Sequence, residues 1–550
     1  MSEIEKTPPT IVPSDADKTG DGASRDAETH HVGKHIVNSD PDEALKLVGG
    51  HHDGDIVLSP EEEKKLLRKI DFRLMPLLCI VYGLNYLDKT TLSYASVMGI
   101  KSDLHLAGKT GLLCKRSIAY FKIRDPTRQR FLETLGYTIG WIASVFYFGY
   151  LFWEWPTNRL LQRLPLAKYS AFNIIVWGLT LCCLAAVKNF GGAIAVRFFL
   201  GVFEAAVSPG FALFTSQWYT IREQGTRVAW WFSFNGWGQI VGGCIAYGIA
   251  VGTASHPILI KSWQLVFLVT GFFTAFMGAL FLYLMPDSPA TARFLTQQER
   301  VMAIERIRVN QQGVGNKHFK WYQCKEALTD PMVWAFVFFS AIASIPNGGI
   351  SNFFSQLIVS FGFTENESLL LGAPGGAVQV ITLLVAGHLG DRWKNRILFS
   401  SAGLLLAIVG LLMIVCLPLS NSGGRLAGYY LYQSSSTGFV ALLGLISTNV
   451  AGWTKKTTAA AMYLIAYCVG NIIGPQVFQS TDAPQYHNAS ITVLVCMCVA
   501  FATLIFIYFW CIYQNKLKAA IRAEPGYIKV DGQEFLDLTD RENPEFIYSL

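Results

Sequence analysis

Charged side chains interrupt two long apolar runs in the first half of the chain, where they could bind an anion and carry a proton. Asp88 and Lys89 lie in the run 73–97, and Arg197 and Glu204 lie in the run 192–218. A charged group in the middle of a bilayer costs about 2.5–3.5 kcal/mol, so such groups usually face the protein interior and have a function. A fixed cation in a low-dielectric pocket attracts a carboxylate far more strongly than in water. Lys89 and Arg197 are therefore the predicted substrate-binding cations.

The two carboxyl groups are the candidates for proton coupling. Coupling needs a group that titrates near neutral pH, as a desolvated carboxyl can. Glu204, deep in its run, is the first candidate and Asp88 is the second. Arg197, Gly201 and Glu204 are spaced i, i+4 and i+7, so they share one helix face, and the glycine would let a backbone or a ligand approach between the charges. This face is predicted to look into a central cavity.

Structural pairing is the alternative for these charges. Arg197 could be satisfied by Glu204 or by a helix end, and Asp88 and Lys89 could each pair with a different neighbour. Glu154, which is flanked by two tryptophans near the end of the second apolar run, is interpreted as an interfacial anchor.

The second half has no ionisable residue well inside its apolar runs and offers amide side chains instead. Four of them could hydrogen-bond the uncharged part of a ureido or amide substrate: Asn347, Asn352, Gln356 and Gln433. Ordinary polar contacts between helices are the alternative interpretation.

The elements that carry these residues are predicted to be membrane helices. The chain has 550 residues, of which 51% are hydrophobic and only 15% charged, and such a composition is too apolar for a soluble multidomain enzyme. A run of roughly 20 mostly apolar residues can cross about 30 Å of hydrocarbon as a helix. Twelve such runs follow residue 72, at about 73–97, 139–157, 168–187, 192–218, 227–251, 263–285, 332–357, 368–388, 397–417, 426–449, 457–479 and 489–513.

The predicted fold class is an all-α membrane protein with twelve transmembrane helices in two six-helix halves and both termini in the cytosol. The polar residues 1–71 are expected to form a disordered cytosolic tail without a cleaved signal. Two capping boxes, Ser59 with Glu62 and Thr296 with Glu299, predict helices that begin on the cytosolic side. The predicted divisions are a first half at 72–285, a linker with an amphipathic helix at 286–331, a second half at 332–514 and a cytosolic tail at 515–550.

The distribution of basic residues predicts the orientation in the membrane. Basic side chains crowd the loops that this topology makes internal, whereas the outer loops after the opening one hold only Lys188, Lys261 and Arg425. The positive-inside bias therefore places both termini in the cytosol. Two glycosylation sequons, at Asn366 and Asn488, fall in loops predicted to be external.

The loop after the eighth apolar run resembles a known signature. The stretch from Gly387 to Arg396, GHLGDRWKNR, is similar to the G-x-x-x-D-R-x-G-R-R/K loop of the major facilitator superfamily, although Lys394 and Asn395 replace a Gly and an Arg. A more degenerate copy lies after the second run at 158–168, as a duplicated six-helix fold would leave. The resemblance implies a conformational gating role for Asp391, Arg392 and Gly387. A plain interfacial charge cluster is the alternative.

Several further stretches narrow the resemblance to the fungal allantoate permease family of anion:cation symporters: NYLDKTTLSYAS from Asn85, EWPTNR from Glu154, RFFLGVFEAAVSPG from Arg197, FSFNGWGQ from Phe232 and PDSP from Pro286. The similarity covers about residues 68–515 and implies proton-coupled uptake of a small organic anion such as allantoate, ureidosuccinate or nicotinate. The partners expected are therefore this anion and the lipid bilayer, with the proton gradient in place of a cofactor, no metal and no nucleic acid. We expect a monomer in the plasma membrane.

Two rival functions stay open from the sequence. One is a fungal metabolite exporter, and the other is a nutrient sensor that binds without transporting. An enzyme is not expected, because the loops show no nucleophile with a base, no metal cluster and no phosphate-binding loop.

The first external loop carries an unusually basic segment at 108–138. In the resembled family this loop is short, so the segment is interpreted as an insertion, one form of which is a retained intron translated in frame. The alternative is a functional external loop that attracts anions. We predict poor order in this segment and retention of transport when it is deleted.

Overall fold

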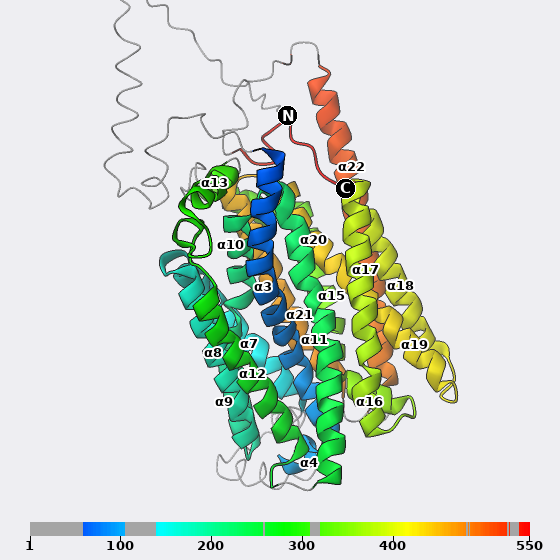
Figure 1. Cartoon of the computed structure of the whole chain (residues 1–550). Helices are drawn as coiled ribbons and strands as arrows, with labels where there is room; N and C mark the ends of the chain where they lie inside the picture. The colour runs from blue at the N-terminus through cyan, green and yellow to red at the C-terminus, as the bar shows by residue number, and fades with distance from the viewer. Residues whose placement is uncertain are drawn as a thin grey trace, which may run out of the picture. The chain divides into compact units, whose positions relative to one another are not determined.

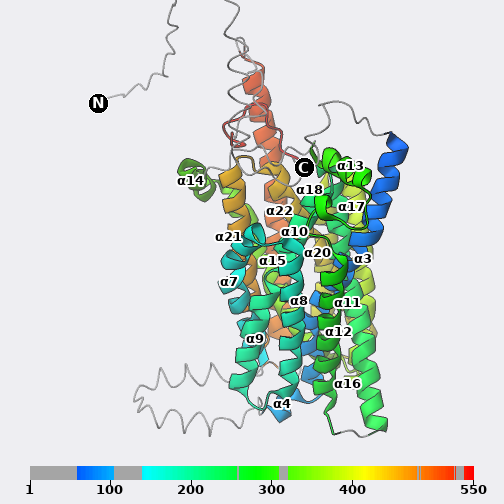
Figure 2. The ribbon, with the colours of Figure 1, turned by 60° about the vertical axis from the view of Figure 1, so that its left-hand side comes forward.

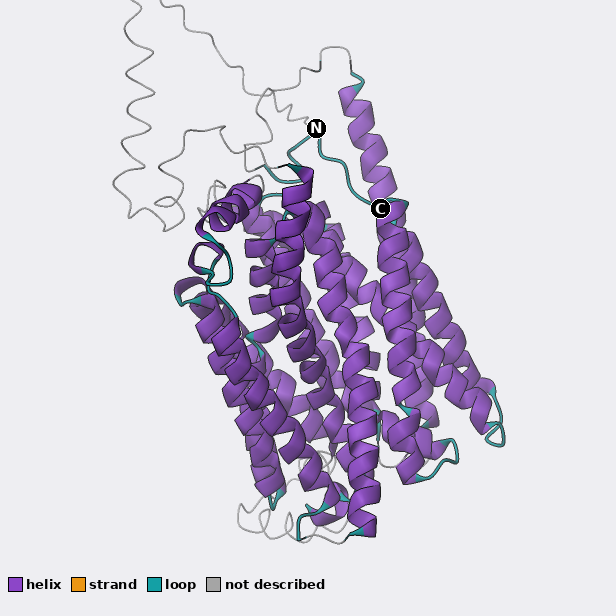
Figure 3. Ribbon diagram, in the orientation of Figure 1, coloured by secondary structure: helices purple, strands orange, loops and turns teal. Residues whose placement is uncertain are grey.

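The computed structural model describes residues 59–104, 139–256, 259–308, 320–479, 482, 485–524, 527 and 538–550. The expectations for residues 1–58 and for the segment 108–138 fall outside the described residues. Within the described ranges the chain forms helices joined by loops, with no strand, as Figure 3 shows. The predicted all-α fold class is confirmed.

Helices cover all twelve predicted spans. The first half comprises α3 (Pro60–Val97), α7 (Ile139–Arg163), α8 (Leu166–Cys183), α9 (Phe190–Glu204) continued by α10 (Val207–Trp218), α11 (Ile221–Ser255) and α12 (Ser262–Leu284). The second half comprises α15 (Pro331–Ser360), α16 (Glu365–Leu371) with α17 (Ala373–Arg392), α18 (Arg396–Cys416), α19 (Ser422–Tyr432) continued through a 3-10 turn by α20 (Ser436–Asn449), α21 (Trp453–Val477) and α22 (His487–Arg522). Figures 1 and 2 show these helices running side by side.

By their length and composition, nine of these spans in the described part of the chain are long and apolar enough to cross a membrane. The other three are α7, α11 and the α19–α20 pair, which are long enough but more polar. Their polar groups bond neighbouring helices, as Gln239 of α11 does when it donates to Tyr429 of α19 over 2.8 Å. A helix that buries such groups against protein does not need a uniformly apolar surface.

The first helix is longer than the membrane is thick. Ser59 caps it in a reciprocal capping box with Glu62, as the sequence predicts, and the helix then continues without a break to Val97. The short helix α4 (Ile100–Asp103) follows at the opposite end of the bundle from α13 (Figure 1). The charge bias makes the α4 end external and the α13 end cytosolic.

The first linker helix is bound to the first half. This helix, α13 (Gln297–Arg308), begins with the predicted capping box of Thr296 and Glu299. Lys69 of α3 forms an ion pair with Glu299 at 2.6 Å. The buried Arg306 pairs with Glu63 of α3 at 3.0 Å and also contacts Glu223 of α11. The cytosolic ends of α3 and α11 are thereby tied to α13.

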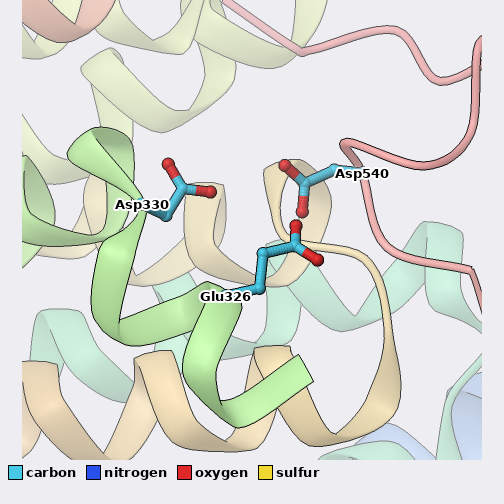
Figure 4. A group of neighbouring side chains, drawn as sticks. All are labelled: Glu326, Asp330 and Asp540. Atoms are coloured by element: carbon cyan, nitrogen blue, oxygen red, sulfur yellow. The ribbon is translucent and has the colours of Figure 1, made fainter. Parts of the chain in front are cut away.

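The second linker helix, α14 (Trp321–Thr329), is bound to the second half instead. Lys455, fully buried in the first turn of α21, forms ion pairs with Glu326 at 2.9 Å, Asp330 at 2.6 Å and Asp540 at 2.7 Å. Figure 4 shows the three carboxyl groups facing one another. Their ligand oxygens lie within 4.8 Å of one another, an arrangement that could hold a cation, and the Lys455 ammonium supplies the positive charge.

The C-terminal residues 538–550 pack on this same cytosolic surface of the second half. Asn515 of α22 exchanges two hydrogen bonds with Tyr548, and Asn449 of α20 exchanges two with Ser549. Tyr548 itself is buried, 4% exposed, and its hydroxyl donates to Asp540. Within the predicted cytosolic tail over 515–550, α22 extends to Arg522 and residues 538–550 supply Asp540 to the Lys455 ion pairs.

The two halves meet along α3–α15, α11–α17 and α7–α21. On the external side, Lys101 donates to Gln356 over 2.7 Å and the backbone N–H of Ser355 donates to the Ser93 hydroxyl over 3.1 Å. Further toward the middle, a Cβ on Gly236 would lie 2.3 Å from the carbonyl oxygen of Gly376, so α11 and α17 are in backbone contact. The structure is therefore closed between the halves on the external side.

Candidate functional site

The centre of the site is a buried ion pair between Lys89 and Glu204. The Nζ atom of Lys89 lies 2.8 Å from Oε1 of Glu204. Asn85, one helical turn before Lys89 on α3, bridges the two: its Nδ2 donates to Glu204 over 2.7 Å and its Oδ1 accepts from Lys89 over 2.8 Å. Glu204 is fully buried, whereas 18% of the Lys89 side chain is exposed. An incoming anion can therefore reach the lysine more easily than the glutamate.

A second pair lies deeper in the first half. Nη1 of Arg197 is 3.9 Å from Oδ1 of Asp88, and both side chains are almost fully buried. Trp177 of α8 donates to the other carboxylate oxygen of Asp88 over 2.7 Å. Among the described residues, Oδ1 of Asp88 and the Nε and Nη2 atoms of Arg197 have no hydrogen-bond partner. This pair keeps unused hydrogen-bonding capacity, unlike a saturated structural ion pair.

Helix geometry decides which charges pair. Consecutive residues on a helix point about 100° apart, so Asp88 and Lys89 face different neighbours. Arg197 could have paired with Glu204 on its own helix. In the structure Arg197 pairs with Asp88 instead, and Glu204 pairs with Lys89.

Gly201 allows a helix, and not a ligand, to approach between Arg197 and Glu204. A Cβ added at Gly201 would lie 2.0 Å from the carbonyl oxygen of Phe146 on α7. The reciprocal contact occurs at Gly149, where a Cβ would lie 2.0 Å from the carbonyl oxygen of Phe198 on α9. The face predicted to look into a cavity is thus covered by α7, and Glu204 and Arg197 extend past it toward α3.

The four amide residues from the second half do not form one cluster. Asn347 donates to Asn471 of α21, and Asn352 donates to the carbonyl oxygen of Gly348 on its own helix. Gln356 accepts from Lys101 and from Tyr486 at the external end. Their spacing along α15 places Asn347 on a different face from Asn352 and Gln356, and all three at different heights. The contacts of Asn347 and Gln356 match the alternative of ordinary polar contacts between structural elements, whereas Asn352 bonds within its own helix.

Gln433 lies in a separate polar group between the halves. Its Nε2 donates to the Tyr429 hydroxyl over 2.8 Å, and Gln239 of α11 donates to the same hydroxyl. Gln239 also donates to the carbonyl oxygen of Gly372 over 2.9 Å. This group joins α11 to α16, α17 and α19, and within the described residues it makes no hydrogen bond with Lys89.

Tyr467, a residue of the second half that interacts with Lys89, was missed by the sequence interpretation. Tyr467 of α21 interacts electrostatically with Lys89, and its ring centroid lies 6.0 Å from that of Tyr147 on α7. The Lys89 ammonium also lies 5.9 Å from the centroid of the Phe146 ring. The sequence offered one signal that could have found this residue: two tyrosines one turn apart in an apolar span, Tyr463 and Tyr467.

In the loop between α17 and α18, Asp391 pairs with Arg396 and not with the adjacent Arg392. Asp391 forms an ion pair at 2.7 Å with Arg396, the first residue of α18, while Arg392 is exposed. The cause is a tight turn: Lys394 has a φ of 52°, in the left-handed region that favours glycine, and it occupies the position of the signature's Gly. Arg396 is thereby turned back toward Asp391. Gly387 has no atom within 4 Å of an added Cβ, so nothing in this arrangement requires a glycine there.

The two sequon residues, Asn366 at the start of α16 and Asn488 at the start of α22, are exposed at the ends of helices that the topology makes external. Asn488 donates to Asp482 over 3.0 Å. Glycosylation at either residue stays a prediction.

Comparison with known proteins assigns the family. The family model described as Major Facilitator Superfamily matches residues 78–475. The chain belongs to this superfamily. The allantoate permease of Saccharomyces cerevisiae is 37% identical over 532 residues, which cover 94% of this chain and 92% of that protein. An uncharacterized transporter of Schizosaccharomyces pombe is 39% identical over 497 residues, covering 90% and 91%.

Solved structures of the superfamily agree with the fold. The xylose transporter XylE from E. coli, in a partially occluded inward open conformation, aligns with a TM-score of 0.54 at 14% identity, covering 80% of this chain and 98% of that one. A bacterial homolog of the human lysosomal transporter Spinster aligns with a TM-score of 0.53, also at 14% identity, covering 82% and 98%. The protein is thus a multi-pass membrane transporter of the allantoate permease-like major facilitators and not an enzyme.

Proposed function

We propose that this major facilitator is a proton-coupled importer of a small organic anion that carries a carboxylate. The observation that supports this most is the Lys89–Glu204 pair, in which a partly exposed ammonium is held 2.8 Å from a fully buried carboxylate. An ammonium of this kind attracts an anion strongly in a low-dielectric site. A carboxylate beside it can bind a proton when the ammonium takes another partner.

Proton and anion binding are coupled through this pair. When a proton from outside neutralises Glu204, the Lys89 ammonium loses its counterion and becomes available to the substrate carboxylate. An anion that arrives first competes with Glu204 and favours its protonation, as linkage requires. Each ligand therefore strengthens binding of the other, and the fully loaded site carries no unpaired charge.

Alternating access then carries both ligands inward. The external contacts Lys101–Gln356 and Ser93–Ser355 join α3 and α4 to α15, so they must part when the site opens to the outside. The linker fits such rocking, because α13 is bound to the first half and α14 to the second. In superfamily members of this architecture the two repeats move against one another around a central site.

The second pair, Asp88 with Arg197, supports the electrostatics of the site. Two nitrogen atoms of Arg197 lack hydrogen-bond partners among the described residues, so this guanidinium is the second candidate contact for the substrate anion. Asp88 is the second candidate proton carrier. Both stay proposals, as do the gating roles of Asp391, Arg392 and Gly387.

The names of two relatives support the proposed substrate class. The 37% identical relative is named an allantoate permease, and another relative in Saccharomyces cerevisiae, 35% identical over 492 residues covering 89% of this chain and 87% of that protein, is named a thiamine pathway transporter. Allantoate carries a carboxylate and ureido groups, which the cation Lys89 and hydrogen-bonding side chains such as Tyr467 could bind. Ureidosuccinate and nicotinate are the further candidates.

An uptake screen tests the substrate and the direction together. Labelled allantoate, ureidosuccinate, nicotinate and thiamine are offered to a transport-deficient yeast strain that expresses the full chain, at external pH 5 and pH 7. We expect accumulation of one anion above the external concentration, stronger at pH 5. Lower accumulation than in the empty strain would indicate an exporter, and binding without flux in purified protein would indicate a sensor. Fluorescence microscopy and size-exclusion light scattering of the same preparation test the proposed plasma membrane location and monomeric state.

A further inference from the structure

A lysine on the external side joins the two halves through an amide side chain. The Nζ atom of Lys101, on α4, donates to Oε1 of Gln356 on α15 over 2.7 Å. The hydroxyl of Tyr486, which directly precedes α22, donates to the same oxygen over 3.0 Å. One acceptor oxygen of the second half therefore serves two donors, and Lys101 is the donor that comes from the first half.

These contacts fix the orientation of the Gln356 amide. A lysine ammonium can only donate, so the amide must turn its oxygen toward Lys101 and its NH2 group away. Gln356 is 7% exposed, and its Nε2 has no hydrogen-bond partner among the described residues. A buried N–H group without a partner is uncommon in folded proteins and marks a place where an acceptor, such as a water or an anion, can bind.

Lys101 is part-buried and forms no ion pair among the described residues. Asp103, two residues further along α4, pairs with Lys261 instead and accepts a hydrogen bond from Trp263 over 2.6 Å. Glu365, at the start of α16 and at the same end of the bundle (Figure 1), acts on Lys101 by its charge, and its side chain is exposed. Burial lowers the pKa of Lys101 to about 8, so the ammonium stays charged at pH 7 and below.

The backbone that positions these groups is strained. Gly99, between α3 and α4, has a φ of 102°, in the left-handed region that favours glycine, and this turn directs Lys101 toward α15. Tyr486 has a φ of 49°, in the same region, which a bulky residue seldom adopts. Its ring packs on Phe478, with the centroids 5.7 Å apart. Strained residues of this kind cluster at ligand-binding sites.

We propose that Lys101 and Gln356 form an outer anion-capture site, where the carboxylate of an entering substrate binds before it reaches Lys89. As the halves begin to part on the external side, the bond between Lys101 and Gln356 breaks. A carboxylate can then enter between the two groups and accept from the ammonium and from the amide N–H. After the substrate has moved inward, Gln356 takes Lys101 back and the external side closes. This inference rests on the proposed import of an anion and adds a binding step to it.

The outer site lies on the path to the central pair. Lys101 follows Lys89 by twelve residues, on the order of 15–20 Å along the bundle for a mostly helical chain. Between the two lysines, the backbone N–H of Ser355 donates to the Ser93 hydroxyl over 3.1 Å, so this contact closes the path in the present state. An anion that leaves Lys101 therefore reaches a second cation once this contact opens.

The kinetics of uptake in Lys101→Met test the outer site. KM and Vmax for labelled allantoate, ureidosuccinate and nicotinate are measured at external pH 5 in the yeast strain that expresses the full chain. We expect KM to rise about tenfold, the low end of the effect of focused charge on association rates. Vmax should change little, because the central pair of Lys89 and Glu204 is intact.

The same measurement at two ionic strengths separates capture from closure. At about 0.01 M and 0.15 M salt the Debye length is about 30 Å and 8 Å, so salt screens a cation at the outer entrance more than one in the buried centre. KM of the unchanged protein should therefore rise with salt, and this dependence should be lost in Lys101→Met. A residue that only holds the halves closed would change Vmax and leave the salt dependence of KM as it is.

Three further variants serve as controls. Lys188→Met removes an exposed external lysine that makes no hydrogen bond or ion pair among the described residues, and KM should stay unchanged. Lys101→Arg keeps the charge and should keep most of the affinity. Gln356→Glu replaces the amide N–H groups by a carboxylate oxygen, which pairs with Lys101 and repels an anion, so KM should rise.

A KM in Lys101→Met within about twofold of the unchanged protein would overturn the outer site, whatever happens to Vmax, because charge effects on association are larger than this. An equal rise in KM in Lys188→Met, or a salt dependence retained in Lys101→Met, would overturn it as well. If Lys101→Met failed to reach the membrane, a normal KM in Gln356→Glu would do so.

Failure of the proposed function has a different result. If the unchanged protein accumulates none of the three labelled anions, import is wrong and the outer site falls with it. If the unchanged protein accumulates one of them while Lys101→Met keeps its KM and salt dependence, only the outer site is wrong.

Discussion

The ammonium of Lys89 lies 2.8 Å from the carboxylate of Glu204, and Asn85 hydrogen-bonds both groups. The sequence separates these charges by more than a hundred residues, and the folded first half brings them together without a contribution from the second half. An anion whose charged contacts all lie on one half can stay bound while the other half moves. Tyr467 lies on the second half and interacts with Lys89. This interaction should therefore change when the halves move.

Removing Lys89 should abolish transport and also destabilise the protein. Lys89→Met leaves Glu204 buried and without its cation, and breaking one partner of a buried ion pair costs about 3–5 kcal/mol. We expect uptake to be lost and the melting temperature in detergent to fall.

The double variant Lys89→Met with Glu204→Gln distinguishes the two effects. Because it removes both charges, it should recover most of the melting temperature and none of the transport. Recovery of transport in the double variant would contradict the role of Lys89 as the substrate cation.

The backbone contact between α7 and α9 should not tolerate a side chain. Gly201→Ala places a Cβ 2.0 Å from the Phe146 carbonyl oxygen, so the helices must separate and the Lys89–Glu204 geometry must change. Overpacking of this kind costs about 1–3 kcal/mol or more. Gly248→Ala on α11 is the control, because no atom lies within 4 Å of its added Cβ. Equal melting temperatures for the two variants would show that the helix contact is looser than described.

The cytosolic ion cluster should stabilise the second half. Lys455→Met leaves the carboxylates of Glu326, Asp330 and Asp540 within 4.8 Å of one another without their shared cation. We expect a fall in melting temperature of the purified full chain, partly reversed by adding Asp540→Asn. Lys456→Met, at the next residue, removes a charge without an ion pair among the described residues and should have little effect. A larger effect at Lys456 than at Lys455 would contradict the cluster.

The basic segment 108–138 lies outside the described residues, and its interpretation as an insertion stays a prediction. Deleting it should leave uptake within about twofold of the full chain, because none of the described site contacts involves it and an effect under about 0.5 kcal/mol is typical of changes away from a site. Sequencing the transcript tests its origin: a spliced message without the segment supports a retained intron, and a full-length message as the sole product excludes one.

Much of the fold could be predicted from the sequence, because twenty-residue apolar runs and the positive-inside bias follow from simple physical limits on membrane helices. The four charged residues of the site were also predicted from the sequence, since a charge in an apolar run is costly and usually has a function. Their pairing was not, because it depends on which way α3 is rotated. The contacts of the α15 amides could not be predicted either, because they depend on the rotation of that helix. Tyr467 was missed because a tyrosine in a membrane helix carries no comparable penalty.

The pH dependence of uptake in Glu204→Gln tests the central claim most directly. With the protein present at normal abundance in the plasma membrane, the account predicts that accumulation of labelled allantoate is lost and that the remaining exchange no longer depends on external pH between 5 and 7. The unchanged protein should take up more at pH 5, because protonation of Glu204 frees Lys89 for the anion. Normal accumulation with the same rise toward acid pH in Glu204→Gln would contradict the account.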